Sequence, residues 1–419
     1  MAKKLFTIFI VTFVITFIIA FIILRNSHKD NDKPSEQPKV EIKNEFNDFD
    51  FKIIKNVTTD YNENFLVSPL SIAYALNMLS DAATGNTKIQ IEKVLDNYKL
   101  SNIKNIDKRL SLANALFVKN SYAGNVREDY LETIKTKYNG DIIFDDFNTP
   151  DVVNNYVSEK TFNMINNAVD KIGPETIFIL ANALAIDVEW NNKFECNKTS
   201  SDKFKMINQI EMDAAYMHSS NDVTYISNDK AEGIIKDYKT YDGVSLEYIA
   251  ILPKTDITFY MNDFDGKELT SLLKNKKNPS DTLDINLSIP KYTYDFNYSN
   301  FKNALKSFGI VDAFDSTKAN FNYLAPDIYV SDAIHKSHIE LSESGTKAAA
   351  VTIFTFDKNA IIEKTKETIN ISFNKPFLYL IKEKNNNNIW FAGIVYEPMK
   401  FEDNTCDDGV GNYENEKTP

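Results

Sequence analysis

The stretch SESGTKAAAVTIFTF, residues 342–356, decides how the rest of the chain is interpreted. It places one glycine among small polar residues, continues through three consecutive alanines, and ends with threonine alternating with bulky apolar residues. The first half is too small to fill a core, whereas the second half has the alternation of a β-strand. The stretch therefore combines the features of an exposed loop with those of a buried strand.

Alternation with a period of two divides this stretch into two faces. One face holds Thr346, Ala348, Ala350, Thr352, Phe354 and Phe356, and the other holds Lys347, Ala349, Val351, Ile353, Thr355 and Asp357. Both charged residues lie on the second face, so the first face can be buried without an unpaired charge. An edge strand or a mobile loop that never enters a sheet would give no reason for this arrangement.

The N-terminus has the composition of a membrane segment. Residues 5–24 carry no charge and follow Lys3 and Lys4, and twenty residues of helix span roughly 30 Å, the thickness of a bilayer core. A cleaved signal peptide has a shorter apolar region and a small-residue cleavage site, neither of which is evident here. Residues 1–24 are therefore a signal anchor or a signal peptide, with the anchor favoured. The expected location is extracellular, either secreted or anchored to the outer face of a membrane.

The remaining chain is predicted to form one large domain. Residues 25–43 are polar, contain Pro34 and Pro38, and are predicted to be a linker, whereas the acidic residues 399–419 are predicted to be disordered. Between them, residues 44–398 have enough apolar chain for a substantial core, since hydrophobic residues make up 43% of the sequence. The formal charge of -12 and the lack of a basic patch argue against a nucleic-acid partner.

Helical patterns come early and strand patterns come late, which favours an α+β fold. Helices are predicted over residues 68–84, with Ser68 as N-cap and Pro69 in the first turn, and over residues 149–169. Apolar runs of strand type follow at 176–190, 245–253, 283–296, 327–341, 368–373 and 377–396. The last run contains an Asn-rich turn and is predicted to be a hairpin.

No enzyme signature is present in the sequence. Glycine-rich phosphate loops and G-x-S-x-G elbows are missing. Cys196 and Cys406 are the two cysteines, and both a single bridge and two unpaired thiols remain open. His335 and His338 are spaced to point to opposite faces of a strand, so shared metal binding is not expected. We predict no metal, no cofactor and no enzymatic activity, although a triad formed only in space is a further alternative.

From about Phe46 to Pro398 the chain resembles the serpin family. The matching segments are NFLVSPLSIAYALNMLSDAATGNTKIQIEKVL, LANALFVK (112–119), ILANALAIDVEWNNKF with Asn182 and Trp190, VSDAIHKSHIELSESGTKAAAVT, and the C-terminal FNKPFLYLI and IWFAGIVYEP. Two departures occur: AIDVEW replaces an aromatic-Lys-Gly stretch, and Asn163 replaces a glycine. The resemblance implies helices packed around a large central β-sheet, with further sheets and an exposed reactive-centre loop.

In this family a protease cleaves the exposed loop, and the freed loop then inserts as a new strand of the central sheet. The resemblance places the hinge at Glu343, Gly345, Thr346, Ala348, Ala349 and Ala350. It places the reactive bond at Asn359–Ala360, or one position earlier at Lys358–Asn359, with Lys364 as a further candidate.

Other matched positions are implied to lie where the sheet opens. Ser68, Ser71, Asn182 and His335 resemble the hydrogen-bonded cluster beneath the sheet, and Trp190 with Glu343 resembles the region where insertion begins. The implied function is irreversible inhibition of a serine or cysteine protease as a suicide substrate. The implied partner is an endopeptidase that becomes covalently bound to a monomeric inhibitor. The alternative is a non-inhibitory serpin that serves as a carrier, chaperone or adhesion module.

Overall fold

The computed structural model describes residues 46–60, 62–346 and 366–402. The predicted N-terminal membrane segment, the linker, hinge residues 348–350 and all candidates for the reactive bond lie outside these residues. Within the described ranges, no helix is both long and apolar enough to cross a membrane.

The described chain contains helices and strands in mixed order, which confirms the predicted α+β class. The α-helices are α2 (Asp48–Asp60), α3 (Pro69–Ala82), α4 (Gly85–Leu95), α5 (Glu128–Tyr138), α6 (Asp151–Lys160), α7 (Ile257–Asp263), α8 (Gly266–Lys274) and α9 (Phe301–Phe308). Short 3-10 turns are η1 (Asn120–Asn125), η2 (Cys196–Lys198) and η3 (Asp312–Phe314).

The strands are β1 (Phe65–Val67), β2 (Leu110–Lys119), β3 (Asp141–Asp145), β4 (Phe178–Ile186), β5 (Val188–Glu189), β6 (Ser200–Lys205), β7 (Glu211–Ser220), β8 (Thr224–Ser227), β9 (Ala231–Asp237), β10 (Leu246–Pro253), β11 (Lys276–Lys277), β12 (Leu283–Pro290), β13 (Tyr292–Asn297), β14 (Lys336–Leu341), β15 (Gly345–Thr346), β16 (Glu367–Ser372), β17 (Phe377–Glu383) and β18 (Ile389–Val395). The predicted C-terminal hairpin is confirmed by the antiparallel pairing of β17 with β18.

Within the described residues, the strands form four hydrogen-bonded sheets. One sheet has the order β1-β18-β17-β10-β9-β8-β11, and another has the order β16-β12-β7-β6. The strands β3-β2-β4 and β13-β14-β15-β5 form the other two. Since only Asp187 separates β4 from β5, these two sheets adjoin there. In the described chain β4 and β14 are not paired, so the predicted central sheet consists of two parts with a gap between them.

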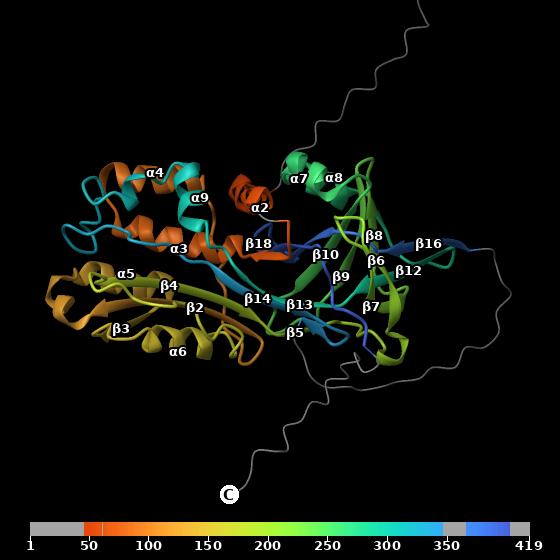
Figure 1. Ribbon diagram of the computed structural model, residues 1–419, viewed down its shortest axis with the longest axis horizontal. Helices are drawn as coiled ribbons and strands as arrows, with labels where there is room; N and C mark the ends of the chain where they lie inside the picture. Colours follow the sequence, from red (N-terminus) through yellow and green to blue (C-terminus); the bar gives the residue numbers. More distant parts are fainter. Residues whose placement is uncertain (1–45, 61, 347–365, 403–419) are drawn as a thin grey trace, which may run out of the picture. The chain divides into compact units, whose positions relative to one another are not determined.

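The part of this sheet formed by β3, β2 and β4 is covered on both faces by helices. Helix α3 packs against β4 on one face, and α6 packs against β2 and β4 on the other, so the strands lie between the two helices (Figure 1). Helix α3 starts as predicted, because the Ser68 hydroxyl accepts a hydrogen bond from the Ser71 N–H at 3.1 Å and Pro69 occupies the first turn.

The helix predicted over 149–169 is too long, because α6 ends at Lys160. The Thr161 hydroxyl accepts from the Ile165 N–H at 3.1 Å, and the next two residues have φ of 55° and 63°. Positive φ at Phe162 and Asn163 is incompatible with a continuing helix. Residues 161–176 instead form an irregular connection between α6 and β4, which we call the strap.

Two predicted strands also differ from the structure. The run 283–296 forms two strands, β12 and β13, that meet at Lys291. The run 327–341 forms a strand only from Lys336 onward, because residues 327–335 border the gap and lack a neighbouring strand among the described residues. A strand requires a hydrogen-bonded partner, which apolar alternation alone does not supply.

Residues 399–401, which the prediction assigns to the disordered tail, are hydrogen-bonded to the rest of the domain. The Met399 N–H donates to the Lys291 carbonyl at 2.8 Å, and the Met399 carbonyl accepts from the Ala215 N–H at 3.0 Å. The Phe401 N–H donates to the Asp213 carbonyl at 3.0 Å, so these residues extend the sheet beside β7. Residues 403–419 lie outside the described chain.

Candidate functional site: the gap between strands β4 and β14

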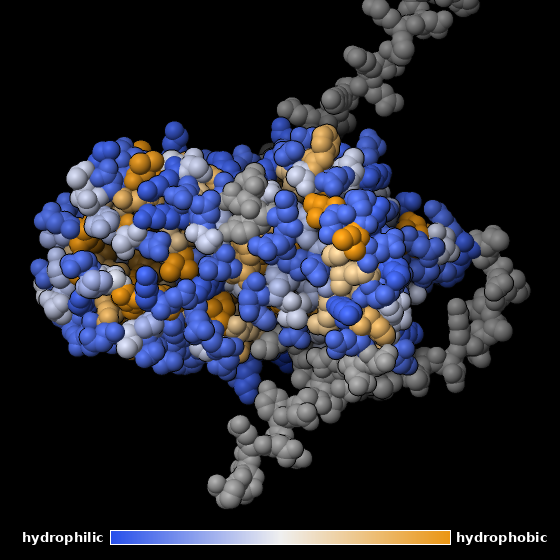
Figure 2. Space-filling view, viewed as in Figure 1, coloured by the Kyte–Doolittle hydropathy of each residue, from blue (hydrophilic) through white to orange (hydrophobic). Residues whose placement is uncertain are grey.

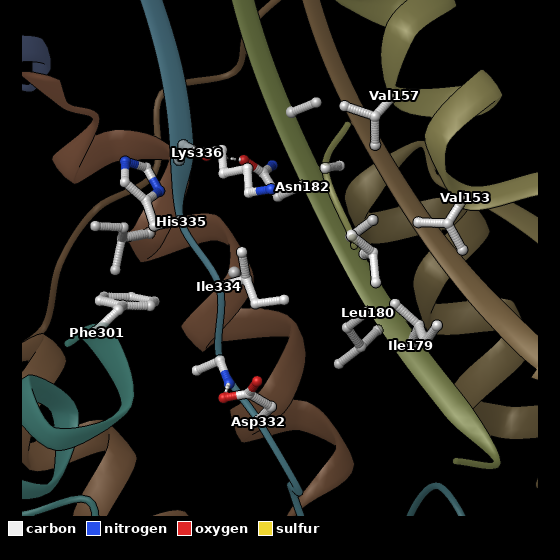
Figure 3. Close-up of a pocket in the computed structure, with 18 of the residues that line it drawn as sticks. Val153, Val157, Ile179, Leu180, Asn182, Phe301, Asp332, Ile334, His335 and Lys336 are labelled. Atoms are coloured by element: carbon white, nitrogen blue, oxygen red, sulfur yellow. Dashed lines mark hydrogen bonds between the residues drawn. The ribbon is translucent and has the colours of Figure 1, made fainter. Parts of the chain in front are cut away.

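A cavity of about 890 Å³ occupies the gap between β4 and residues 327–340. Helix α3 and α9 line one side of it, and the strap lines the other. Figure 2 shows apolar side chains gathered in a hollow of the surface, and Figure 3 shows residues from both walls of the cavity. An apolar channel between two strand-like walls can accept an extended segment of chain.

At the end of the gap next to β5, a short strand, β15, already fills the space between the two walls. In β15, Thr346 lies opposite Leu341 of β14 and Val188 of β5, and Gly345 lies opposite Glu189. The first two residues after the 342–344 turn are therefore buried in the sheet, with Thr346 only 4% exposed. The predicted exposed loop can begin only after this point.

Gly345 is required here by a close backbone approach and by its conformation. A Cβ atom at this position would lie 2.2 Å from the carbonyl oxygen of Val188, and the φ of the residue is 155°. Any side chain would push β15 away from β5. The sequence predicts that Gly345 acts as a hinge because the glycine backbone is flexible. The structure shows in addition that a side chain at this position would collide with the backbone of Val188.

Trp190 holds the turn that precedes β15. Its indole N–H donates to the Ser342 carbonyl and its backbone N–H donates to the Ser344 carbonyl, both at 3.0 Å. Its ring stacks on Tyr238 with centroids 4.4 Å apart, and the Tyr238 hydroxyl is 2.7 Å from the Thr346 hydroxyl. Trp190 follows β5 and Tyr238 follows β9, and both residues thus hold this segment in place through hydrogen bonds.

Glu343 is a buried carboxylate with partners from two other segments. Lys291 Nζ lies 2.8 Å from Glu343 Oε2, and both side chains are almost fully buried. The Thr199 hydroxyl donates to Glu343 Oε1 at 2.7 Å, and the Phe194 N–H donates to the Glu343 carbonyl at 3.0 Å. An ion pair buried this deeply is tolerated only when both partners are present. We call residues Trp190, Thr199, Tyr238, Lys291, Glu343 and Thr346 the hinge site.

The middle of the gap contains a second set of polar residues, which includes Ser68 and His335. The Ser68 hydroxyl donates to the Trp390 carbonyl at 2.6 Å, and the Ser68 N–H donates to His335 Nε2 at 3.1 Å. The His335 ring lies beside Phe301, with centroids 5.8 Å apart (Figure 3). Burial lowers the pKa of His335 to about 4, so the ring is neutral at neutral pH and Nε2 can accept.

On the opposite wall, a chain of hydrogen bonds runs through Asn182. The Ser71 hydroxyl donates to Asn182 Oδ1, and Asn182 Nδ2 donates to Asn114 Oδ1 at 2.6 Å. Asn114 Nδ2 in turn donates to the Tyr138 carbonyl at 2.8 Å. We call Ser68, Ser71, Asn114, Asn182 and His335 the mid-gap cluster.

The structure thus brings the predicted residues together in two pairs that meet on α3. Ser68 bonds to His335 on one wall, and Ser71 bonds to Asn182 on the other. Among the described residues no hydrogen bond joins Asn182 to His335, because the gap separates them. The sequence predicts these residues as one cluster but does not predict the space between the walls.

Several residues of both sites are not predicted from the sequence, namely Asn114, Thr199, Tyr238 and Lys291. Asn114 carries a usable signal, because the pentapeptide LANAL occurs at 112–116 and again at 180–184. In the structure these two copies pair antiparallel, with Asn114 directly opposite Asn182. Lys291, Thr199 and Tyr238 reach Glu343 and Thr346 only through tertiary contacts.

The cysteines and the two histidines of the H-x-x-H spacing have separate roles. Cys196 is disulfide-bonded, and Cys406, the only other cysteine in the sequence, lies outside the described residues. His338 Nδ1 lies 2.7 Å from Asp295 Oδ1, whereas His335 faces Ser68. Among the described residues, no three acidic, histidine or cysteine side chains are placed to hold a metal ion.

Comparison with known proteins relates most of the chain to one family. The model of the family described as serpin (serine protease inhibitor) matches residues 44–398. An uncharacterized serpin-like protein of Methanosarcina acetivorans is 30% identical over 84% of this chain and 85% of its own length. The crystal structure of the thermophilic serpin tengpin in its native state has a TM-score of 0.72 and 30% identity, covering 84% of this chain and 92% of that one.

A more distant structure shows the same fold. Thyroxine-binding globulin in complex with thyroxine has a TM-score of 0.69 at 24% identity, covering 84% of this chain and 98% of that chain. At that identity the likeness concerns the fold alone.

Proposed function

The chain belongs to the serpin family, and from this premise we propose that it is an irreversible protease inhibitor acting as a suicide substrate. Most members of the family inhibit proteases, although some do not, and serpins are generally not enzymes. In the proposed mechanism, the target protease cleaves the loop that follows Thr346. The freed loop then enters the gap between β4 and β14 as a new strand.

The observation that carries this proposal is that β15 already occupies the end of the gap next to β5. Its two residues pair antiparallel with β14 on one side and with β5 on the other. Continued without a bulge, these registers place Ala348 between Ile339 and Ile186, and Ala350 between Ser337 and Leu184. Small side chains thus come first, where the two walls must part. Successive added residues form backbone hydrogen bonds with the two walls in turn, which favours insertion.

The same registers give the charged and polar loop residues suitable neighbours. Lys347 comes to lie between Glu340 and Asp187, so its charge meets carboxylates on both walls. Thr352 comes to lie between Asn182 and His335, in the middle of the mid-gap cluster. A threonine hydroxyl can both donate and accept there, which would link the two walls that are now separate.

The length of the gap supports the predicted reactive bond. Strand β4 begins at Phe178, and the β15 register continued along it brings residue 356 opposite that end. A strand paired along the whole of β4 therefore ends closer to the predicted Asn359–Ala360 bond, or to Lys358–Asn359, than to Lys364. Lys358 would suit a trypsin-like serine protease, and Asn359 would suit an asparaginyl or less selective cysteine protease.

In the chemical step, the protease nucleophile adds to the carbonyl carbon of the residue before the bond. The C–N bond breaks, and the new amine leaves with a proton while the loop stays attached to the protease as an acyl group. Insertion then carries the acylated protease away from its leaving group and distorts it before water can release it. Residues 5–24 are proposed to hold the domain on the outer side of a membrane, or to direct its secretion.

The proposal is tested by incubating the purified chain with a panel of serine and cysteine proteases. We expect one class to give a complex that survives SDS denaturation, with the cut at residue 358 or 359. Cleavage should also raise the melting temperature sharply, because the inserted strand completes the sheet. Cleavage without a complex and without stabilisation would contradict the proposal and favour a carrier, chaperone or adhesion role.

A further inference from the structure

Cys196 lies between two contacts that hold Glu343 at the hinge site. The Phe194 N–H donates to the Glu343 carbonyl at 3.0 Å, and the Thr199 hydroxyl donates to Glu343 Oε1 at 2.7 Å. Cys196 starts the 3-10 turn η2 between these two residues, and its carbonyl accepts from the Thr199 N–H at 3.1 Å. A group that holds Cys196 in place therefore also holds the segment 194–199 against Glu343.

The sulfur of Cys196 is part of a disulfide. The sequence contains one other cysteine, so within a single chain the partner is Cys406. Cys406 lies outside the described residues, four positions after the last of them, Glu402. Four residues of extended chain span at most about 14 Å, and the Cα atoms of a bridge are at most about 7 Å apart. The tail must therefore end near η2 for the bridge to form.

The C-terminal tail and η2 both lie against strand β7. The Met399 carbonyl accepts from the Ala215 N–H and the Phe401 N–H donates to the Asp213 carbonyl, both at 3.0 Å. The turn η2 packs against β7 and leads into β6, which pairs with the other edge of β7 (Figure 1). Two segments that are far apart in the sequence thus meet on one strand, where a bridge of this reach can join them.

We propose that Cys196 and Cys406 form a redox-sensitive clamp that ties the C-terminal tail to the segment that holds Glu343. With the bridge closed, the segment 194–199 cannot leave the hinge site unless the tail, which is hydrogen-bonded to β7, moves with it. With the bridge open, the segment is held by its own contacts alone. The inference rests on the proposed function where it concerns cleavage of the loop, although the bridge itself does not.

Opening the clamp is a two-electron reduction by a dithiol. One sulfur of the dithiol, as a thiolate, attacks the bridge and forms a mixed disulfide, while the other cysteine sulfur leaves. The second sulfur of the dithiol then displaces the remaining cysteine, so the reagent becomes a cyclic disulfide and its two protons pass to Cys196 and Cys406. Cys196 is only partly buried, which leaves it accessible to a small thiol. In the oxidising space outside a cell the bridge persists.

The clamp also decides what becomes of the two fragments of the cleaved chain. All candidates for the reactive bond lie between Cys196 and Cys406, so cleavage there leaves one cysteine on each fragment. The C-terminal fragment carries β16, β17 and β18, which a denaturant would release from an unbridged protein. The bridge keeps this fragment attached, so the cleaved inhibitor stays in one covalent piece.

The first test is cleavage of the full chain in its loop, followed by SDS gels with and without dithiothreitol. Any protease that cuts between residues 347 and 365 is suitable, so the test does not require inhibition. We expect one band near the intact mass without dithiothreitol and two fragments with it. Cys406→Ser should give two fragments under both conditions.

Lys198→Met is the matched control in the same turn. It removes an ion pair with Glu195 at 2.6 Å but leaves the bridge intact. Both side chains of this pair are more than half exposed, so the pair contributes little to stability. This variant should behave like the parent chain on both gels and in the exchange experiment below.

The second test is hydrogen exchange of the intact, uncleaved chain, which shows whether the clamp acts on the hinge site. Dithiothreitol should raise exchange of the Phe194 and Thr199 amides about tenfold, as for the loss of about one hydrogen bond. Cys406→Ser should show the same rise without dithiothreitol, and adding the reagent should cause no further change.

Joined fragments together with faster exchange on reduction support the clamp. Two fragments from the parent chain without dithiothreitol, or a dimer bridged between two copies, would overturn it. Unchanged exchange at Phe194 and Thr199 after reduction would also overturn it, since the bridge would then join the segments without holding the hinge site. If the loop is cut and no protease forms an SDS-stable complex, the proposed function fails, and the two tests still decide the clamp.

Discussion

The hinge site and the mid-gap cluster lie along the same two walls, but among the described residues only the hinge site has a strand between them. At the hinge site, Thr346 is buried against Tyr238 and Glu343 is paired with Lys291. At the mid-gap cluster, Asn182 and His335 each bond to α3 instead of to a partner across the gap. Where a third strand is present, the polar side chains of the walls bond to it or around it; where it is absent, they bond to residues at the start of α3. Each prediction below alters the hinge site, the mid-gap cluster, or a loop residue that is proposed to reach that cluster.

The largest effect is expected from Thr346→Arg at the hinge site. A guanidinium in this buried position would lack a counterion, so the strand could not be seated and the protein should become a plain substrate. The SDS-stable complex should disappear while cleavage continues, as read on a gel at increasing ratios of inhibitor to protease. Lys347→Arg is the control, because the alternation of the sequence predicts that Lys347 lies on the charged face of the strand, and it should still inhibit. Retained inhibition by Thr346→Arg would contradict insertion.

Glu343→Gln should give the next largest effect, on stability. It leaves Lys291 buried without a counterion, a change that typically costs about 3–5 kcal/mol. Urea denaturation of the uncleaved chain would measure it. The double variant Lys291→Met, Glu343→Gln should recover much of this loss, because no buried charge remains unpaired. A double variant as unstable as the single one would show that the ion pair is not the cause.

At the mid-gap cluster, the pH dependence of stability should report His335. Burial lowers the pKa of His335 to about 4 in the folded chain, against about 6.5 when unfolded, so the unfolded state binds the proton more tightly. The contribution is fully present above pH 6.5 and is lost as the pH falls toward 4, by roughly 3 kcal/mol in total.

The measurement compares urea stability between pH 7 and pH 4 for the parent chain and for His335→Gln. The variant should lose less stability on acidification. His338→Gln is the control, since His338 lies beside Asp295 and is only partly buried, and it should keep the steep dependence of the parent chain. Identical pH profiles for the parent chain and His335→Gln would refute this origin of the acid sensitivity.

The smallest effect is expected from Thr352→Val, which asks whether the mid-gap cluster comes to resemble the hinge site after insertion. The cleaved form should lose about 1 kcal/mol, the worth of a typical hydrogen bond, because the hydroxyl between Asn182 and His335 is gone. Calorimetry of the cleaved form would measure this loss. Thr355→Val removes a hydroxyl on the opposite face and should cost less; equal losses would argue against the register.

Much of the fold is predictable, because in most elements a strong local sequence pattern coincides with a packing or hydrogen-bonding partner in the tertiary structure. Ser68 and Pro69 mark the start of α3, and the alternation of 377–396 marks the hairpin. The failures occur where tertiary partners decide the outcome. Residues 327–335 have strand composition but border an unfilled gap, and α6 stops at Lys160 because Phe162 and Asn163 adopt positive φ.

The candidate site shows the same division. Glu343, Gly345, Thr346 and Trp190 are predictable because they stand in or match the segments around the hinge. Lys291, Thr199 and Tyr238 come from three other segments, and nothing in their own sequence marks them as partners of Glu343 or Thr346. Asn114 is intermediate, since the repeated LANAL is a local signal, but only the antiparallel register of β2 and β4 brings the two copies together.

By itself, the sequence determined which residues of the stretch 342–356 are suited to burial and which are suited to solvent. Side-chain size, charge and a period of two are local properties. The sequence also determined the family, because the matching segments run in the same order along the chain. Only the tertiary structure decided that Gly345 is needed for space against Val188. It alone showed that β4 and β14 stand apart, and that Cys196 lies in the segment that holds Glu343. These features depend on which distant segments meet, and a close approach or an unfilled gap leaves no trace in local composition.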